Sequence, residues 1–217
     1  GLLINISFNS GEELFINNCS FYNCSGDLDG TTGILINNNF DLFPITIFKC
    51  NFINCYHLNG YVISVMPNIV TIEQCNILFS SNEAFKSCGG IYINYETITI
   101  IDSSFKNCRN NCVYNKYKTD NSLIEMRNNH FIKCIPYYDE YSMNKNHLWK
   151  LTLNNKPIIS DNIIEGVNYG NYYFLITIYH SELTLINNTF KNFQINGTSF
   201  GGGTGSWIVP GNPRFSI

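Results

Sequence analysis

Cysteine and histidine are the residues of this chain best suited to bind a metal, but their spacing does not fit a zinc site. Structural zinc sites usually include two cysteines separated by only two residues. None of the nine cysteines forms such a pair, and the four histidines are scattered. We therefore expect no metal and no cofactor. The residues concerned are Cys19, Cys24, Cys50, Cys55, Cys75, Cys88, Cys108, Cys112, Cys134, His57, His130, His147 and His180.

Carboxylates that could cleave a polysaccharide are dispersed along the chain. A polygalacturonase-like hydrolase needs clustered aspartates, and a calcium-dependent lyase needs several carboxylates beside a basic residue. Glu125 and Arg127 lie on one face of one strand, but that spacing suits a surface ion pair equally well. We predict no catalytic residue and no enzyme, and we keep a carbohydrate-active lyase or hydrolase as the alternative.

An insertion at residues 136–150 carries the residues most typical of a ligand site. Long loops on repeat proteins project from one face and often bind ligands, and aromatic rings beside carboxylates suit sugar recognition. The alternative is a solvated loop that packs on the protein without a ligand. The candidate residues are Tyr137, Tyr138, Asp139, Glu140, Tyr141 and Trp149.

Acceptor motifs for N-linked glycans begin at five asparagines, a number that chance explains in so Asn-rich a chain. Asn196 lies in the most open segment and is the preferred site, followed by Asn187 and Asn5. The net charge is −3 and no run of Lys or Arg occurs, which argues against nucleic acid as a partner. No apolar run is long enough to span a bilayer. Since the chain starts at Gly1 without a leader, we expect a mature product or fragment of a secreted or surface protein.

A repeat organises the chain and predicts its fold. Ile45-Thr46-Ile47 leads to Cys50, Phe52, Asn54 and Cys55, and comparable units recur every 25–32 residues. Alternation of apolar and polar residues is typical of a strand with one buried face, and a strand of this length buries that face only by stacking on copies of itself. The sequence predicts a right-handed parallel β-helix of roughly eight coils. It would span residues 1–196, followed by a Gly-rich tail at 197–217.

The cysteines and asparagines follow the repeat. We expect mostly reduced, buried cysteines, with Cys108–Cys112 and Cys24–Cys55 as the pairs best placed for a disulfide. We place Asn129, Asp161 and Asn188 at equivalent corners, and Asn18, Asn128 and Asn187 at another set. Two explanations stay open for these residues: a hydrogen-bonded interior ladder, or the tolerance of Asn for left-handed turns.

The threonines Thr46, Thr71, Thr99 and Thr184 also share one position of the repeat. They are predicted to face outward. Such a column allows an ice-binding face, but the neighbouring outward column is irregular and the high β-propensity of threonine explains it adequately.

The repeat resembles a known family of surface proteins. Cys88-Gly89-Gly90-Ile91, together with Phe-x-Asn turns such as Phe105/Asn107, is similar to the repeats of polymorphic outer membrane proteins, the β-helical adhesins of chlamydiae. The resemblance covers residues 14–193, but Gly-Gly is intact only once. It implies surface exposure and adhesion, with no catalytic site to carry over. A non-catalytic structural or adhesive module is thus the predicted function, and carbohydrate or a host surface its expected partner.

The C-terminal tail suggests a further partner. Gly201–Gly205 leads into Trp207-Ile208-Val209, which either folds over the last coil as a cap or continues the stack into another copy or a flanking domain. A head-to-tail contact of this kind would build a filament.

Overall fold

The computed structural model of the chain is an all-β parallel solenoid. It describes residues 4–6, 13–26, 31–37, 44–57, 59–66, 69–79, 87–93, 97–108, 112–115, 123–134, 149–152, 158–166, 176–179, 184–192 and 205–208. Within these segments every regular element is a strand, and no helix is long and apolar enough to cross a membrane.

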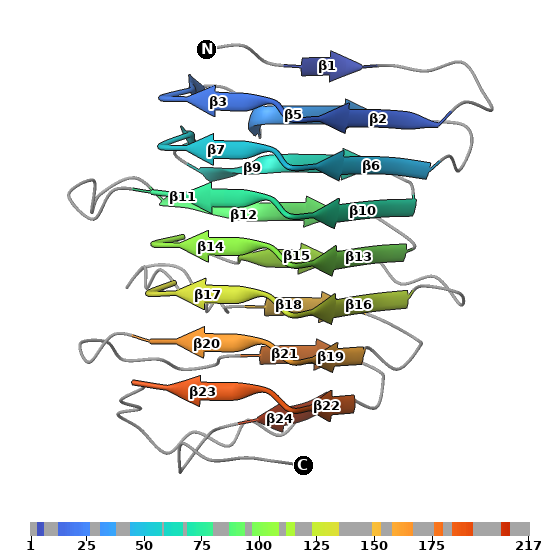
Figure 1. Ribbon diagram of the computed structural model, residues 1–217, viewed down its shortest axis with the longest axis vertical. Coiled ribbons are helices and arrows are strands. Elements are labelled where there is room, and N and C mark those ends of the chain that lie inside the picture. The colour runs from blue at the N-terminus through green and yellow to red at the C-terminus, as the bar shows by residue number, and fades with distance from the viewer. Residues whose placement is uncertain are drawn as a thin grey trace.

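Three long sheets run the length of the molecule (Figure 1). Sheet A consists of β1 (Ile4–Ile6), β5 (Thr31–Asn37), β9 (Asn59–Met66), β12 (Ser87–Ile93), β15 (Val113–Asn115), β18 (Trp149–Thr152), β21 (Ile176–Tyr179) and β24 (Gly205–Ile208). Sheet B consists of β2 (Leu14–Asn17), β6 (Pro44–Phe48), β10 (Ile69–Glu73), β13 (Thr97–Ile101), β16 (Leu123–Arg127), β19 (Ile158–Ser160) and β22 (Thr184–Ile186). Sheet C consists of β3 (Ser20–Tyr22), β7 (Asn51–Ile53), β11 (Asn76–Leu78), β14 (Ser104–Lys106), β17 (His130–Ile132), β20 (Ile163–Glu165) and β23 (Thr189–Lys191). A fourth, two-stranded sheet pairs β4 (Ser25–Gly26) with β8 (Tyr56–His57).

One coil takes a strand from sheet B, then from sheet C, then from sheet A. Sheets B and C each contain seven strands, so the described residues form seven such coils rather than the predicted eight. Neighbouring strands pair in parallel, and the pairing of Phe52 with Ile77 and of Phe131 with Ile164 sets coil lengths from 25 to 33 residues. The predicted fold class, a parallel β-helix, is confirmed.

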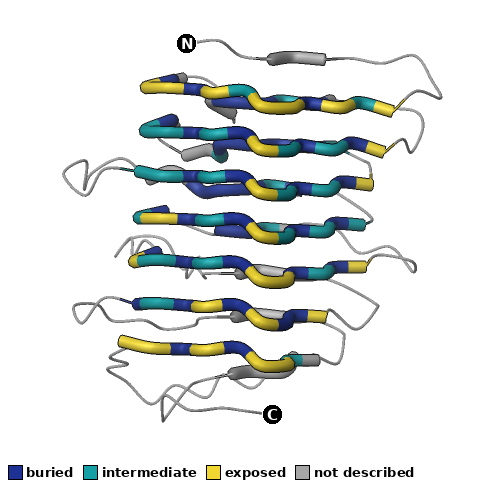
Figure 2. The backbone as a smooth tube through the Cα atoms, viewed as in Figure 1, coloured by how far each residue is buried: buried dark blue, intermediate teal, exposed yellow. Residues whose placement is uncertain are grey.

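The core lies inside the three sheets and follows the alternation read from the sequence. Buried and exposed positions alternate along β6, β10, β13 and β16, and buried positions recur at the same place in successive coils (Figure 2). A column of phenylalanines recurs inside the coils, where Phe52, Phe105 and Phe131 are fully buried. The rings of Phe105 and Phe131 stack with centroids 4.7 Å apart.

A single residue in the left-handed conformation makes the bend between sheets B and C in every coil. The first of these corners is at Asn18, with φ of 57°, and the last at Asn187, with φ of 53°. Asn tolerates this conformation better than most residues, so left-handed tolerance is the correct explanation for Asn18, Asn128 and Asn187. The full column is Asn18, Lys49, Gln74, Asp102, Asn128, Asp161 and Asn187.

One register assignment from the sequence was wrong. Ile164, rather than Ile163, pairs with Phe131 and Phe190, which moves Asp161 into the left-handed column and places Asn162 beside Asn129 and Asn188. A shift of one residue exchanges the two faces of a strand. The doublet Ile163-Ile164 fits the pattern in either register, which is why the sequence alone misplaced it.

Glycine precedes the inward isoleucine of sheet A where neighbouring coils come closest. A Cβ atom on Gly33 would lie 2.7 Å from the carbonyl oxygen of Val62, and one on Gly90 would lie 2.5 Å from that of Cys112. A larger residue at Gly33 or Gly90 would force the neighbouring backbone to shift. This contact explains the Gly-Ile and Gly-Gly-Ile motifs.

The C-terminal strand β24 reverses direction. It pairs with β21 in antiparallel orientation, with Trp207 opposite Thr177. In Figure 1 it lies at the end of the stack near the C-terminus. Residues 193–204 lie outside the described segments, so the boundary at residue 196 stays a prediction.

Candidate functional site

Most of the predicted ligand loop lies outside the described residues. This applies to Tyr137, Tyr138, Asp139, Glu140 and Tyr141. Trp149 is the first residue of β18, where its backbone pairs with Val113 and Ile176. Trp149 thus belongs to the framework of sheet A, and sugar recognition by the loop stays a prediction.

The glycan candidates fall in three different settings. Asn187 is exposed at a left-handed corner. Asn5 is the central residue of β1 and pairs with Leu35. Asn196 lies outside the described residues. Of the three, only Asn187 has a described side chain, and its exposure is compatible with a glycan.

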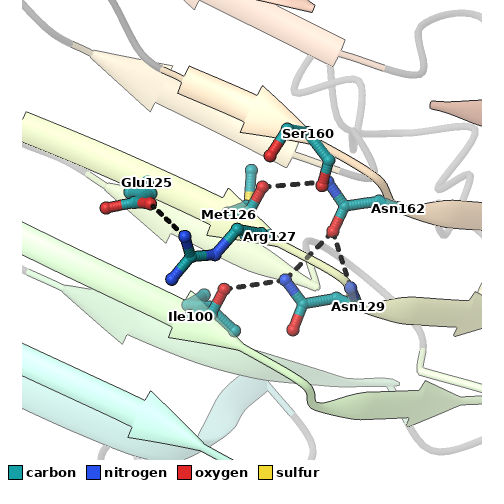
Figure 3. A network of polar contacts seen from close by, with 7 residues as sticks. All are labelled: Ile100, Glu125, Met126, Arg127, Asn129, Ser160 and Asn162. Atoms are coloured by element: carbon teal, nitrogen blue, oxygen red, sulfur yellow. Dashed lines mark hydrogen bonds and ion pairs between the residues drawn. The ribbon is translucent and has the colours of Figure 1, made fainter. Parts of the chain in front are cut away.

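Two carboxylates of the described residues, Glu125 and Glu165, each form an ion pair on the surface. Glu125 is 3.9 Å from Arg127 (Figure 3), and Glu165 is 3.2 Å from Lys191. The hydrogen bond from Lys191 lowers the pKa of the Glu165 carboxyl. The two pairs belong to different sheets, since Glu125 lies on β16 of sheet B and Glu165 on β20 of sheet C.

An interior ladder of asparagine amides occupies the corner that follows the left-handed residue. Asn129, Asn162 and Asn188 are almost completely buried. The Asn162 amide donates to the carbonyl oxygens of Met126 and Ser160 at 2.9 and 2.8 Å, and its own oxygen accepts from the backbone N–H of Asn129 at 2.9 Å (Figure 3). Asn188 repeats the pattern one coil further on, donating to the carbonyl of Ile159. The interior ladder is therefore the correct explanation for Asn129 and Asn188, whereas left-handed tolerance is the correct one for the column of Asn18, Asn128 and Asn187.

Cysteines fill the same column in the first three coils. The Cys75 thiol donates to the carbonyl of Ile47 at 3.3 Å and accepts from the backbone N–H of Cys50 at 3.4 Å. Ser103 links the cysteine part of the column to the asparagine part. Its hydroxyl accepts from the backbone N–H of Cys75, and its backbone N–H donates to the side-chain oxygen of Asn129. We call the whole set, Cys19, Cys50, Cys75, Ser103, Asn129, Asn162 and Asn188, the interior column.

Hydrogen bonds and burial shift the pKa values of these thiols in both directions, and the hydrogen bond with Cys75 lowers the pKa of Cys50 to about 6. The hydrogen bond with Cys50 and burial both raise the pKa of the Cys75 thiol. Burial raises the pKa of Cys55, at the next corner, to about 12. Thiols with a raised pKa are poor nucleophiles, because the thiolate is the reactive form. Their role in the described core is packing and hydrogen bonding.

Three tyrosines form a cluster on the outer face of sheet A, which we call the tyrosine cluster. The ring centroids of Tyr61 and Tyr92 are 5.1 Å apart, those of Tyr92 and Tyr114 are 5.4 Å apart, and those of Tyr61 and Tyr114 are 6.2 Å apart. The rings come from three successive coils, on β9, β12 and β15, and each is half-buried. Strand pairing and mutual ring contacts therefore hold the three rings together on this face of sheet A.

A second cluster lies inside the protein and consists of three cysteines. The sulfur atoms of Cys108, Cys112 and Cys134 all lie within 4.8 Å of one another, and all three residues are buried. None of the eight cysteines whose side chains are described is in a disulfide, so the two pairs best placed for one, Cys108–Cys112 and Cys24–Cys55, are not bridged. The expectation of reduced, buried cysteines is confirmed for seven of them, and Cys19 is half-buried.

Sequence reasoning missed both clusters, although signals for each were present. Cys108 and Cys134 share a corner of the repeat, and Cys112 follows Cys108 by four residues. Tyr92 and Tyr114 share one outward position of sheet A, but Tyr61 lies three residues before the equivalent position on β9. Only the placement of sheet A brings Tyr61 to the other two rings.

Comparison with known proteins found no match, so a functional proposal must rest on the fold and on these sites. No protein-family model, no curated protein and no solved structure matches the chain.

Proposed function

We propose that the chain is a non-catalytic structural and adhesive module of the cell surface that binds neutral carbohydrate through the tyrosine cluster. The observation that carries the proposal is the contact of three half-buried tyrosine rings on the outer face of sheet A. Aromatic rings present flat apolar faces with a polar hydroxyl at the edge. That combination suits a sugar ring, whose C–H face packs on the aromatic ring while its hydroxyls meet polar groups.

The backbone beneath the cluster supports this role. Tyr92 and Tyr114 occupy paired positions on adjacent strands, and Ser64, the partner of Tyr92 on β9, is only 4% exposed. A ligand that binds rings already held by the sheet loses little affinity to ordering them. Sites on strands are also held more firmly than sites on loops.

Acidic residues in the described part support a binding role rather than hydrolysis. Glu125 pairs with Arg127 on sheet B, and Glu165 pairs with Lys191 on sheet C. Hydrolysis, in contrast, requires two carboxyls that flank one bond. We expect no turnover of polygalacturonate or alginate. Turnover that disappears on replacing Asp139, Glu140 or Glu165 would contradict a non-catalytic role.

Tyr92→Ala tests the carbohydrate proposal. Binding of the chain to an array of neutral oligosaccharides should identify ligands, whose affinity is then measured by calorimetry. Removing the middle ring should weaken binding about 2- to 12-fold, because an aromatic contact contributes on the order of 0.5–1.5 kcal/mol.

Tyr22→Ala is the matched control. Tyr22 lies on sheet C of the same solenoid and is 59% exposed. Its replacement should leave the affinity for the oligosaccharide unchanged. An array without any bound glycan, or equal losses in the two variants, would contradict the tyrosine cluster as the binding site.

Adhesive modules commonly act in series, and the strand edges support the same arrangement here. Sheets B and C end at β22 and β23 at one end of the described stack and at β2 and β3 at the other, and an unpaired edge is a template for another strand. We propose that copies, or flanking domains, associate end to end. Light scattering on the chain and on a version ending at Asn196 tests this proposal, and strictly monomeric behaviour of both at high concentration would contradict it.

Export to the cell surface is part of the same proposal. The exposed side chain of Asn187 supports it, because that residue begins an acceptor motif for a glycan. The buried thiols do not conflict with an oxidising environment, since their burial shields them from solvent oxidants. Mass spectrometry of the natural protein tests this point, and an unmodified Asn5, Asn187 and Asn196 would count against a glycosylated surface protein.

A further inference from the structure

We propose that Cys108, Cys112 and Cys134 bind one soft metal ion, and that their three sulfur ligands favour Cu(I). The cluster is independent of the tyrosine cluster and of the carbohydrate proposal. Its sulfur atoms lie within 4.8 Å of one another, and the residues are 0%, 0% and 3% exposed.

The three cysteines reach one point from two different parts of the coil. Cys108 follows β14 and Cys134 follows β17, so they occupy the same corner of two successive coils. Cys112 directly precedes β15 of sheet A, at the register position that Gly90 and Val62 hold in the two preceding coils. Val62 is completely buried at that position, so the column already accommodates an inward side chain of similar size.

The third sulfur distinguishes this corner from the others. Cys24 and Cys55 occupy the same corner in the first two coils, but among the described residues only the set with Cys112 forms a group able to hold a metal ion. Packing alone accounts for one cysteine per corner. It does not account for a third thiol directed at the same point from sheet A.

Distances in the cluster suit a metal–sulfur site. Metal–thiolate bonds are about 2.3 Å long, so two sulfurs on one metal are at most about 4.6 Å apart. Small rotations of the side chains would close the present spacing to that value. The thiols now make long contacts to backbone carbonyls, at 3.4 Å from Cys134 to Phe105 and 3.8 Å from Cys108 to Ile77. Because sulfur hydrogen bonds are weak, a metal ion would displace them readily.

The donor set selects the ion. Hard cations such as calcium and magnesium require oxygen ligands, whereas thiolates bind soft ions, Cu(I) among them. Structural zinc sites use four protein ligands, and the group identified in the described residues offers three. Each thiol that binds the metal as thiolate releases its proton to solvent. The single positive charge of Cu(I) then offsets one of the thiolate charges that burial makes costly.

Metal analysis of the full chain tests the site. The chain is produced in copper-supplemented medium, and a second sample is purified, reduced and incubated with Cu(I) without oxygen. Both samples are desalted against a competing chelator and analysed for metal and protein. We expect about one copper per chain, with a thiolate-to-metal absorption band and three sulfur neighbours by X-ray absorption. The same protocol with Zn(II) should leave little zinc bound.

Cys112→Val is the decisive variant, because Val62 shows that valine fits this column. It should fold and lose its copper to the competing chelator at a concentration at least about tenfold lower than the unaltered chain does, since it leaves only two sulfur ligands. Cys55→Val, a buried cysteine outside the cluster, should retain copper like the unaltered chain. The proposal is overturned if the unaltered chain holds no copper in either sample, if it retains zinc in preference, or if Cys112→Val holds copper against the chelator as well as the unaltered chain does.

Discussion

The cysteine half and the asparagine half of the interior column hydrogen-bond to the same backbone groups of the neighbouring coil through different side chains. In the first coils the position is cysteine, and its contacts to backbone groups are 3.3–3.6 Å long. In the last three coils it is asparagine, and the contacts are 2.6–3.0 Å long. In both halves one coil supplies an acceptor for the N–H of the coil before it and a donor for a carbonyl of that coil. The backbone thus requires a small side chain with a donor and an acceptor at this corner.

The difference lies in how much each half depends on that side chain. An amide makes strong hydrogen bonds and, once removed, leaves buried N–H and C=O groups unsatisfied. A thiol makes weak ones and stabilises mainly as a small buried apolar group. The amide half should therefore be the more sensitive to truncation.

The largest effect is expected for Asn162→Ala. The change removes donors to Met126 and Ser160 and the acceptor for the N–H of Asn129, which should lower the free energy of unfolding by about 3–5 kcal/mol. Chemical denaturation followed by circular dichroism measures it. Asp161→Asn is the control, because Asp161 is exposed in the left-handed column, and it should change stability by less than about 0.5 kcal/mol. A larger effect at Asp161 than at Asn162 would refute the register.

A smaller effect is expected for the matching change in the thiol half. Cys75→Ala removes one sulfur contact to Ile47 and the weak acceptor of the Cys50 N–H. The same denaturation experiment should show a loss of about 1–2 kcal/mol. A loss equal to that of Asn162→Ala would mean that thiols and amides contribute alike, and the contrast between the halves would fail.

The smallest expected effect is a dependence on alkaline pH at Cys55, a buried thiol at the corner next to the interior column. The pKa of Cys55 is raised to about 12 in the folded chain, whereas an unfolded thiol titrates near 8.5. Since the folded value is the higher one, its contribution to stability is complete below pH ~8.5 and declines as pH rises toward 12. Stability measured at pH 7 and pH 10 should fall less in Cys55→Val than in the unaltered chain. An equal or greater fall in the stability of Cys55→Val would contradict a raised pKa of Cys55 as the cause.

Much of this architecture could be predicted from the sequence because its signals are local and repeated. The alternation in Ile45-Thr46-Ile47 and the recurrent phenylalanines led to the coil, the buried column and the parallel stacking. The register at Asp161 and Asn162 could not be predicted, because Ile163 and Ile164 satisfy the pattern equally well. Only the hydrogen bonds of a buried amide decide between them.

The candidate sites were less predictable because they depend on how separate columns meet. Cys112 and Tyr61 lie outside the repeat positions read from the sequence, and each joins its cluster only through the pairing of sheet A. The predicted ligand residues, in contrast, were chosen for composition within one loop. Composition does not carry information about which columns become neighbours in space.

Native-state hydrogen exchange at the interior column tests the central claim, that one continuous column links the coils, most directly. The backbone amides of Asn129 and Asn162 donate to side-chain oxygens of the next coil at 2.9 and 3.0 Å, and that of Cys50 donates to sulfur at 3.4 Å. All three should exchange far more slowly than surface amides, with Asn129 and Asn162 the slowest and close to the rate set by global unfolding. Exchange of Asn129 and Asn162 at the rate of surface amides would contradict the column and the stacking that depends on it.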